Sequence, residues 1–106
     1  MTIVIYVKLD DTAARICARV MRLLREAREA QGISGSQLAD RSGLNQSTIS
    51  LLDRGERKPT LDTLVRIAGV LKIELGEILL QATEDIRAGR DLKNGKSAQA
   101  RSGRAG

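Results

Sequence analysis

The amino-acid sequence predicts an all-α fold of five helices, and three observations lead to this prediction. Apolar residues recur every three or four positions in successive segments between residues 12 and 80, which is the spacing of one helix face. Short stretches with Gly, Ser, Asn or Pro separate these segments, and such residues start and end helices. The chain has 106 residues and one aromatic residue, so we expect one domain with an aliphatic core.

Residues 1–11 are predicted to form a short N-terminal extension. Its apolar stretch, Ile3 to Val7, is rich in β-branched residues and is compatible with an edge strand, a strand shared between subunits or a disordered end. No basic residues precede the stretch and no small-residue cleavage site follows it. The segment therefore does not resemble a signal peptide.

The first helix is expected at about residues 12–31. Asp10, Asp11 and Thr12 are candidates for its N-terminal cap, and Gly32 is expected to end it. Apolar residues at helical spacing form its inward face, namely Ile16, Val20, Leu23, Leu24 and Ala27.

Five arginines also lie on this first helix. We expect them to form a solvated face, partly paired with Glu26 and Glu29 at helical spacing; they are Arg15, Arg19, Arg22, Arg25 and Arg28. Cys17, on the same helix, is expected to be a small buried apolar residue.

The second and third helices are short and follow each other closely. Ser34 and Gln37 have the spacing of a capping box, which predicts a helix from Ser34 to about Arg41. Gly43 then interrupts the helical pattern, and Asn45 is a candidate cap for a third helix that ends near Asp53. In this third helix Ile49 and Leu52 are the inward residues, and Gly55 follows where a helix end favours glycine.

Two more helices complete the predicted domain, which we expect to span residues 12–83. Pro59 and Thr60 begin a fourth helix, whose apolar positions are Leu61, Leu64, Val65, Ala68 and Leu71. A fifth, short helix contains Ile73, Leu75, Ile78 and Leu79. Five helices with short connections favour a small all-α globule.

Residues 84–106 are expected to form a basic, disordered tail. Their Gly-, Ser- and Ala-rich end, NGKSAQARSGRAG, has too few apolar residues to offset the entropy of ordering. Residues 1–86 contain 12 Lys and Arg and 12 Asp and Glu, whereas residues 87–106 contain six basic residues and one acid. The net charge of +5 therefore comes from residues 87–106, and the pI near 10 does not show that the folded part is basic.

The composition argues against several classes of protein. The chain has no His, and Cys17 is its only cysteine, so Ser-His and Cys-His nucleophile pairs, internal disulfides and most zinc sites are excluded. No apolar run approaches the roughly 20 residues that a membrane span needs. We therefore expect a cytoplasmic protein that is not an enzyme, has no cofactor or metal, and binds no membrane or evident small-molecule ligand.

One constellation predicts a helix-turn-helix. Two helices that cross through a short turn need a small residue where their backbones approach, and Ala39 is suitable. Gly43 tolerates the positive φ of such a turn. Leu44 is expected to fill the turn, while Ile49 and Leu52 anchor the second helix.

The opposite face of that second helix suits a DNA major groove. Gln can bond adenine through two hydrogen bonds, Ser can bond either base of a pair, and Leu can pack on a thymine methyl group. The residues expected on this face are Gln46, Ser47, Ser50 and Leu51. Basic residues near both ends of the motif are candidates for phosphate contacts, namely Arg41, Arg54, Arg57 and Lys58.

These residues resemble the Cro- and phage-repressor-like helix-turn-helix regulators, the XRE family. The resemblance covers roughly residues 13–80 and rests on RVMRLLREAREAQGISGSQLADRSGLNQSTISLLDRGERKPTLDTLVRIAGVL and the closing KIELGEIL. It implies a five-helix lambda-repressor-like domain, with a positioning helix from Ser34 and a recognition helix from Asn45. It also implies base contacts from Gln46, Ser47 and Leu51, sometimes with Ser50, and phosphate contacts from Arg41, Asn45, Arg54, Arg57 and Lys58.

Two positions depart from the pattern of this family. Many members have Gln at the position of Gly35, where the side chain braces a phosphate and a residue of the recognition helix. Gly35 has no such side chain, although backbone amides at this helix start can hold a phosphate. Leu51 replaces a common polar residue, so it is either a base contact or an ordinary exposed leucine.

The sequence thus predicts a transcriptional regulator of double-stranded DNA, of the repressor type. Such modules usually act as homodimers on half-sites about 34 Å apart. Leu75, Ile78 and Leu79, with Leu80, exceed what so small a core is expected to bury and are the candidate dimer interface; Ile3–Val7 is the second candidate. The alternative function is an antitoxin-like or cofactor-like protein-interaction module on the same fold.

Overall fold

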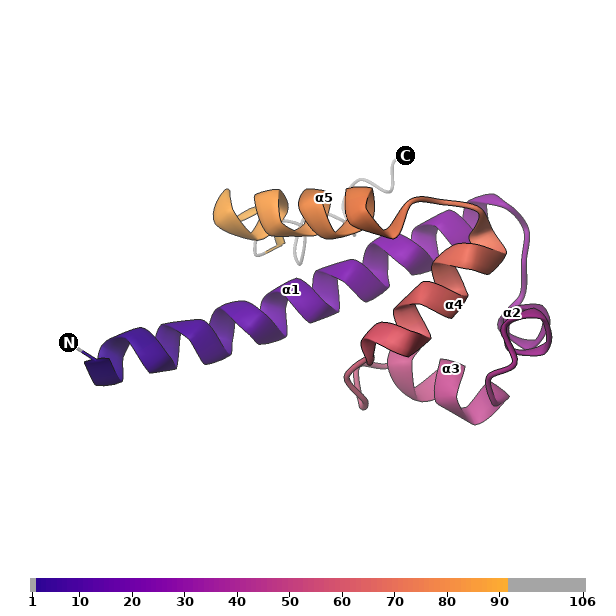
Figure 1. Ribbon diagram of the computed structural model, residues 1–106, viewed down its shortest axis with the longest axis horizontal. Helices are drawn as coiled ribbons and strands as arrows, with labels where there is room; N and C mark the ends of the chain where they lie inside the picture. The colour runs from indigo at the N-terminus through magenta and orange to yellow at the C-terminus, as the bar shows by residue number, and fades with distance from the viewer. Residues whose placement is uncertain (1, 92–106) are drawn as a thin grey trace.

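The computed structural model describes residues 2–91, with side chains described for Leu9 and from Asp11 onward. Within this range it contains five helices and no strand: α1 (Thr2–Ala30), α2 (Gly35–Ser42), α3 (Gln46–Asp53), α4 (Leu61–Leu71) and α5 (Leu75–Arg87). In Figure 1, α2, α3 and α4 gather around the C-terminal half of α1, while α5 lies along α1. The all-α prediction is confirmed.

The core is aliphatic, as expected from a sequence with one aromatic residue. Its largest fully buried side chains are Val20 and Leu24 of α1 and Ile67 and Leu71 of α4. Buried residues from the other helices complete the cluster, among them Leu38, Ile49, Leu52 and Ala82. Every helix therefore contributes at least one side chain to the same core, which fixes α2 and α3 relative to α1.

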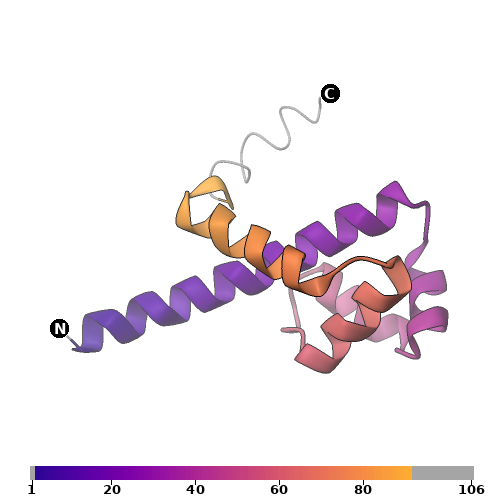
Figure 2. The same cartoon turned by 45° about the horizontal axis from the view of Figure 1, so that its top comes forward.

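The first helix is longer than predicted, and the strand alternative for Ile3–Val7 is wrong. Helix α1 begins at Thr2, so the predicted extension of residues 1–11 is mostly helical. The physical reason is that no Gly or Pro occurs before Gly32, and extending an existing helix costs far less than nucleating one. Figures 1 and 2 both show the N-terminal end of α1 extending beyond the other helices.

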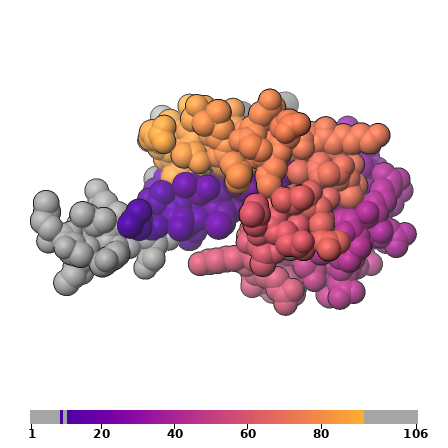
Figure 3. Space-filling model, viewed as in Figure 1, coloured from indigo at the N-terminus to yellow at the C-terminus, as the bar shows by residue number. Residues whose placement is uncertain are grey.

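The C-terminal boundary of the folded part also differs from the prediction. Helix α5 runs to Arg87 rather than ending before residue 84, and its packing along α1 is visible in Figure 3. Asp85 is only 2% exposed, and its carboxylate accepts from Arg19 Nε of α1 at 2.8 Å and from Arg90 Nε at 2.7 Å. Residues 84–91 therefore belong to the folded body. The remainder of the predicted tail, residues 92–106, lies outside the described residues.

The arginines of α1 do not all form a solvated face. Two of them do pair as expected with acids one turn on: Arg22 with Glu26 and Arg25 with Glu29. The other three hold distant segments together, because Arg15 binds Asp91, Arg19 binds Asp85 and Arg28 binds Asp53. The prediction failed for these three because their partners lie 25 to 76 residues away in the sequence.

Several apolar side chains are more exposed than predicted. Cys17 is half-buried instead of buried. On α4, Leu61 is 66% and Val65 55% exposed, although both share the helical spacing of the buried residues. Leu64, Ile67, Ala68 and Leu71 already fill the inward face of this short helix, so Leu61 and Val65 lie outside it.

Candidate nucleic-acid interface

Helix α2 begins with the predicted capping box. The Ser34 hydroxyl accepts a hydrogen bond from Gln37 N at 3.0 Å, and the Gln37 side-chain oxygen accepts one from Ser34 N at 2.9 Å. These two bonds satisfy backbone donors that the first turn of a helix leaves open. They fix where α2 starts, and therefore where the turn after it falls.

The turn between α2 and α3 has the geometry expected of a helix-turn-helix. Gly43 adopts a left-handed conformation with φ of 77°, and its N–H and that of Leu44 both donate to Ala39 O at 3.1 Å. Ala39 is buried where the helices approach, and Leu44 is half-buried against the core. Glycine is favoured there by φ. An added Cβ would lie 3.2 Å from the Arg66 guanidinium, which donates to Ser42 O and would have to shift slightly.

Helix α3 presents two different faces. Ile49 and Leu52 are each 3% exposed and anchor the helix to the core. Gln46 and Ser47 are exposed, while Ser50 and Leu51 are half-buried. Asn45 occupies the N-cap position with extended backbone, but its side chain makes no cap hydrogen bond, contrary to the expected capping role.

A buried arginine that the sequence did not reveal as structural fixes the C-terminal end of α3. Arg28 is 8% exposed; its Nη1 donates to Ile33 O at 3.0 Å and its Nη2 to Asp53 Oδ2 at 3.2 Å. One guanidinium thus joins α1, the segment before α2 and the last residue of α3. Because α3 is held at its middle by apolar contacts and at its end by this ion pair, its outward face is presented in a defined orientation.

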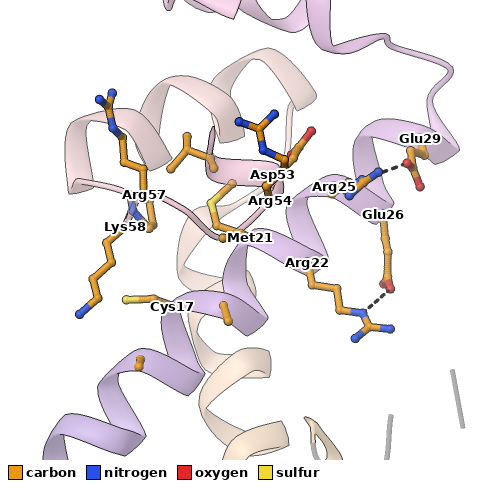
Figure 4. Close-up of a pocket in the computed structure, with 15 residues that line it drawn as sticks. Cys17, Met21, Arg22, Arg25, Glu26, Glu29, Asp53, Arg54, Arg57 and Lys58 are labelled. Atoms are coloured by element: carbon orange, nitrogen blue, oxygen red, sulfur yellow. Dashed lines mark hydrogen bonds and ion pairs between the residues drawn. The ribbon is translucent and has the colours of Figure 1, made fainter. Parts of the chain in front are cut away.

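The loop after α3 carries three of the predicted basic residues, Arg54, Arg57 and Lys58. Arg54 is paired with Glu56, and its Nη1 also donates to Ser50 Oγ at 3.3 Å. Arg57 Nη1 lies 3.5 Å from Thr48 Oγ1 of α3, which places this cation beside the helix. Lys58 is exposed, and in Figure 4 Arg57 and Lys58 extend from the loop in opposite directions.

An open groove of about 600 Å³ separates this loop from α1. Ala14, Cys17, Ala18 and Met21 of α1 line one side, and residues 54, 55 and 57–59 line the other. Figure 4 shows Arg22 and Arg25 on the rim, each paired with its glutamate. The groove adjoins the basic loop but is separate from the outward face of α3.

The other predicted site residues are placed less closely together. Arg41 is exposed in the last turn of α2. Leu75, Ile78 and Leu79 pack partly buried against the core of their own chain, and only Leu80, at 60% exposed, points clearly outward. The apolar surplus that suggested a dimer interface on α5 is therefore mostly used within the fold, because α5 packs along α1.

Two negative findings concern only residues 2–91. No helix in that range is long and apolar enough to cross a membrane. The same residues contain no group of three or more His, Cys, Asp or Glu that could hold a metal ion.

Comparison with known proteins agrees with this geometry. Residues 24–78 match the model of the helix-turn-helix family. The uncharacterised HTH-type transcriptional regulator y4dL of Sinorhizobium fredii is 46% identical over 56 residues, which are 53% of this chain and 29% of that protein. Two uncharacterised HTH-type transcriptional regulators of Mycobacterium tuberculosis, MT0491 and Rv0474, are each 37% identical over 59 residues, which are 56% of this chain and 42% of each relative. The chain thus spans less than half the length of these relatives.

Proposed function

The chain belongs to the Cro- and phage-repressor-like helix-turn-helix family, and from this premise we propose that it is a repressor that reads double-stranded DNA with α3 in the major groove. The observation that carries the proposal is the division of α3 into a buried face and a polar outward face. Ile49 and Leu52 are buried, whereas Gln46 and Ser47 are free to reach base edges.

Phosphate contacts in this proposal come from the two sides of α3. Asn45 and Arg41 lie near the turn, and Arg57 and Lys58 lie in the loop beyond the helix. Exposed amide, guanidinium and ammonium groups position a protein on the DNA backbone without reading sequence. Ser50 and Leu51 are half-buried, and we assign them contacts with base edges next to those of Gln46 and Ser47.

We further propose that two copies bind a two-fold-related site, because a single helix of this size buries too little surface for high specificity. Helix α5 remains the proposed pairing element, with Leu80 as its exposed apolar residue beside Leu75, Ile78 and Leu79. Leu80→Glu should give monomers in sedimentation with the helical content unchanged. This variant is a cleaner test than a change at Ile78, which also packs against the core.

The experiment that tests the function selects bound sequences from random DNA and then measures affinity against salt. The selected duplex should bind at least ~10³ times more tightly than random DNA, and binding to both should weaken steeply as salt rises. Equal affinity for the two duplexes would contradict base reading and favour the alternative, an antitoxin-like or cofactor-like protein-interaction module.

Two substitutions separate reading from backbone contact. Gln46→Ala should cost roughly 1–3 kcal/mol on the selected duplex and relax the preference at one base step. Arg57→Ala should weaken binding to both duplexes alike, while Arg87→Ala, an exposed arginine on α5, serves as the charge-matched control and should change neither. If Gln46→Ala weakened random DNA as much as the selected duplex, its role as a base contact would be wrong.

A further inference from the structure

Glu56 occupies the Nε and Nη2 hydrogen-bond donors of Arg54, which a DNA phosphate would need for a two-bond contact. Arg54 caps the C-terminus of α3, and Gly55, with φ of 73°, turns the chain so that Glu56 faces the guanidinium. Arg54 Nε donates to Glu56 Oε2 at 3.0 Å, and Arg54 Nη2 donates to Oε1 at 3.3 Å. The carboxylate thus binds the guanidinium through two parallel hydrogen bonds.

The chemistry of this pair resembles that of an arginine–phosphate contact. A guanidinium offers its Nε and Nη2 protons as a planar fork, and both carboxylate and phosphate oxygens accept that fork through two bonds. Arg54 cannot present the same edge to DNA while Glu56 holds it. Its Nη1 is directed to Ser50 Oγ on α3, so the paired side chain lies along the helix proposed to enter the groove.

We propose that Glu56 is an internal competitor for DNA phosphate, which holds Arg54 in the free protein and must be displaced before Arg54 binds the backbone. This inference rests on the proposed function, because it names how one phosphate contact of that interface is controlled. Glu56 then lowers affinity for all DNA alike, since phosphates carry no sequence information. The proposed base contacts of α3 still discriminate between DNA sequences, while the sequence-independent part of the binding free energy is reduced.

Charge and exposure support such an exchange. The Arg54 guanidinium has a raised pKa and the Glu56 carboxyl a lowered pKa, each chiefly because of their mutual hydrogen bond, so both are ionised at neutral pH. Their side chains are 55% and 56% exposed. An exposed ion pair favours the paired over the separated side chains by no more than about fivefold. A DNA phosphate can therefore displace the Glu56 carboxylate from Arg54.

The protein contains a matched control for this pair. Arg25 and Glu29 of α1 form a bridge of 3.2 Å with side chains 49% and 57% exposed, shown in Figure 4. Glu56→Gln and Glu29→Gln therefore remove the same charge and release the same kind of arginine, at two different places. We expect Glu56→Gln to tighten binding about two- to fivefold on both the selected duplex and random DNA, and Glu29→Gln to leave both affinities unchanged.

Repeating the Glu56→Gln change in an Arg54→Ala background separates competition from simple repulsion. If Glu56 acts by holding Arg54, the second change should have no further effect on DNA affinity. The inference is overturned if the tightening persists without Arg54, if Glu29→Gln tightens binding equally, or if Glu56→Gln acts on the selected duplex alone. A wild-type chain with no affinity for either duplex would instead overturn the proposed function, and the inference with it. Circular dichroism melts of each variant verify that the fold is retained.

Discussion

Asp85→Asn tests whether the end of α5 is held to α1 by a buried charge. The Asp85 side chain is 3% exposed, and its carboxylate accepts from Arg19, Gln81 and Arg90 at 2.8, 2.8 and 2.7 Å. Asparagine has nearly the same shape but no charge, and one of its oxygens is replaced by an amide donor. The variant keeps the packing but loses the charge and the acceptor at one of the two oxygens, of which Oδ2 accepts from Arg19 and Oδ1 from Gln81 and Arg90.

The expected loss follows from the exposure of the partners. Removing one member of a buried ion pair typically costs about 3–5 kcal/mol. Arg19 is 11% exposed, so leaving it without its partner should cost nearly this much. Arg90 is 50% exposed, and water can solvate its charge. Asparagine also retains one acceptor oxygen, so we expect the free energy of unfolding to fall by about 2–4 kcal/mol. For a domain of this size that lowers Tm by roughly 10–25 °C.

The pH dependence supplies a second, independent prediction for the same variant. Burial raises the pKa of the Asp85 carboxyl, but the hydrogen bonds from Arg90, Arg19 and Gln81 outweigh burial and leave the pKa below its ordinary value. A carboxyl with a lowered folded-state pKa stabilises the fold above its unfolded-state pKa of about 3.9 and loses that stabilisation as pH falls through the folded-state value. The difference between wild type and Asp85→Asn should therefore be full at pH 7 and shrink at acidic pH.

Urea unfolding followed by circular dichroism at pH 7 and at pH 3–4 measures both effects. Glu84→Gln removes the neighbouring, exposed carboxylate and should change the free energy of unfolding by less than about 0.5 kcal/mol. The stabilising role of the Asp85 charge is refuted if Asp85→Asn is as stable as the Glu84→Gln control at pH 7. It is also refuted if the destabilisation by Asp85→Asn grows as the pH falls.

Three further substitutions test the packing. Gly69→Ala should stabilise the fold by about 0.5–1 kcal/mol in thermal unfolding, because Gly69 lies within α4 and an added Cβ meets nothing within 4 Å; a destabilised variant would show that the face is covered. Gly43→Ala should destabilise the fold by about 1–2 kcal/mol in thermal unfolding, because alanine is strained at the φ of 77°. Equal stability would contradict the left-handed conformation at this position. Leu24→Ala should cost about 2–5 kcal/mol in urea unfolding, because Leu24 is 1% exposed, and a smaller loss would place it outside the core.

The helix-turn-helix itself was predictable because its determinants are local. The capping box of Ser34 and Gln37 and the left-handed Gly43 act within a few residues, and α2 and α3 begin and end within a residue or two of the expected positions. The inward positions Ile49 and Leu52 follow from helical spacing alone and are buried as expected. Such short-range rules require no knowledge of the rest of the fold.

The ion pairs that connect distant segments were not predictable in the same way. Arg28 and Asp53 lie 25 residues apart, and Arg19 and Asp85 lie 66 apart. In the sequence, nothing distinguishes Arg19 and Arg28 from Arg22 and Arg25, which pair locally with acids one turn on. Only the placement of α3 and α5 against α1 decides which arginines turn inward. The C-terminal end of α5 was not predicted for the same reason. In the sequence Asp85 resembles a residue of a polar tail, and only the fold shows that it pairs with Arg19.

Local placement of the charged side chains, rather than net charge, decides whether the surface beside α3 is basic. Residues 1–86 contain equal numbers of acidic and basic residues. Two of these basic residues, Arg19 and Arg28, are largely buried and bind Asp85 and Asp53. Among the side chains that the structure describes, those of Leu9 and residues 11–91, no ion pair joins a carboxylate to the exposed Arg41, Arg57 or Lys58. Three exposed cations without an ion-pair partner among these side chains therefore lie beside the proposed reading helix. Glu56 lies in the same loop as Arg57 and Lys58, whereas Glu29 lies on α1. Removing the Glu56 charge should therefore change the affinity for DNA, and removing the Glu29 charge should not.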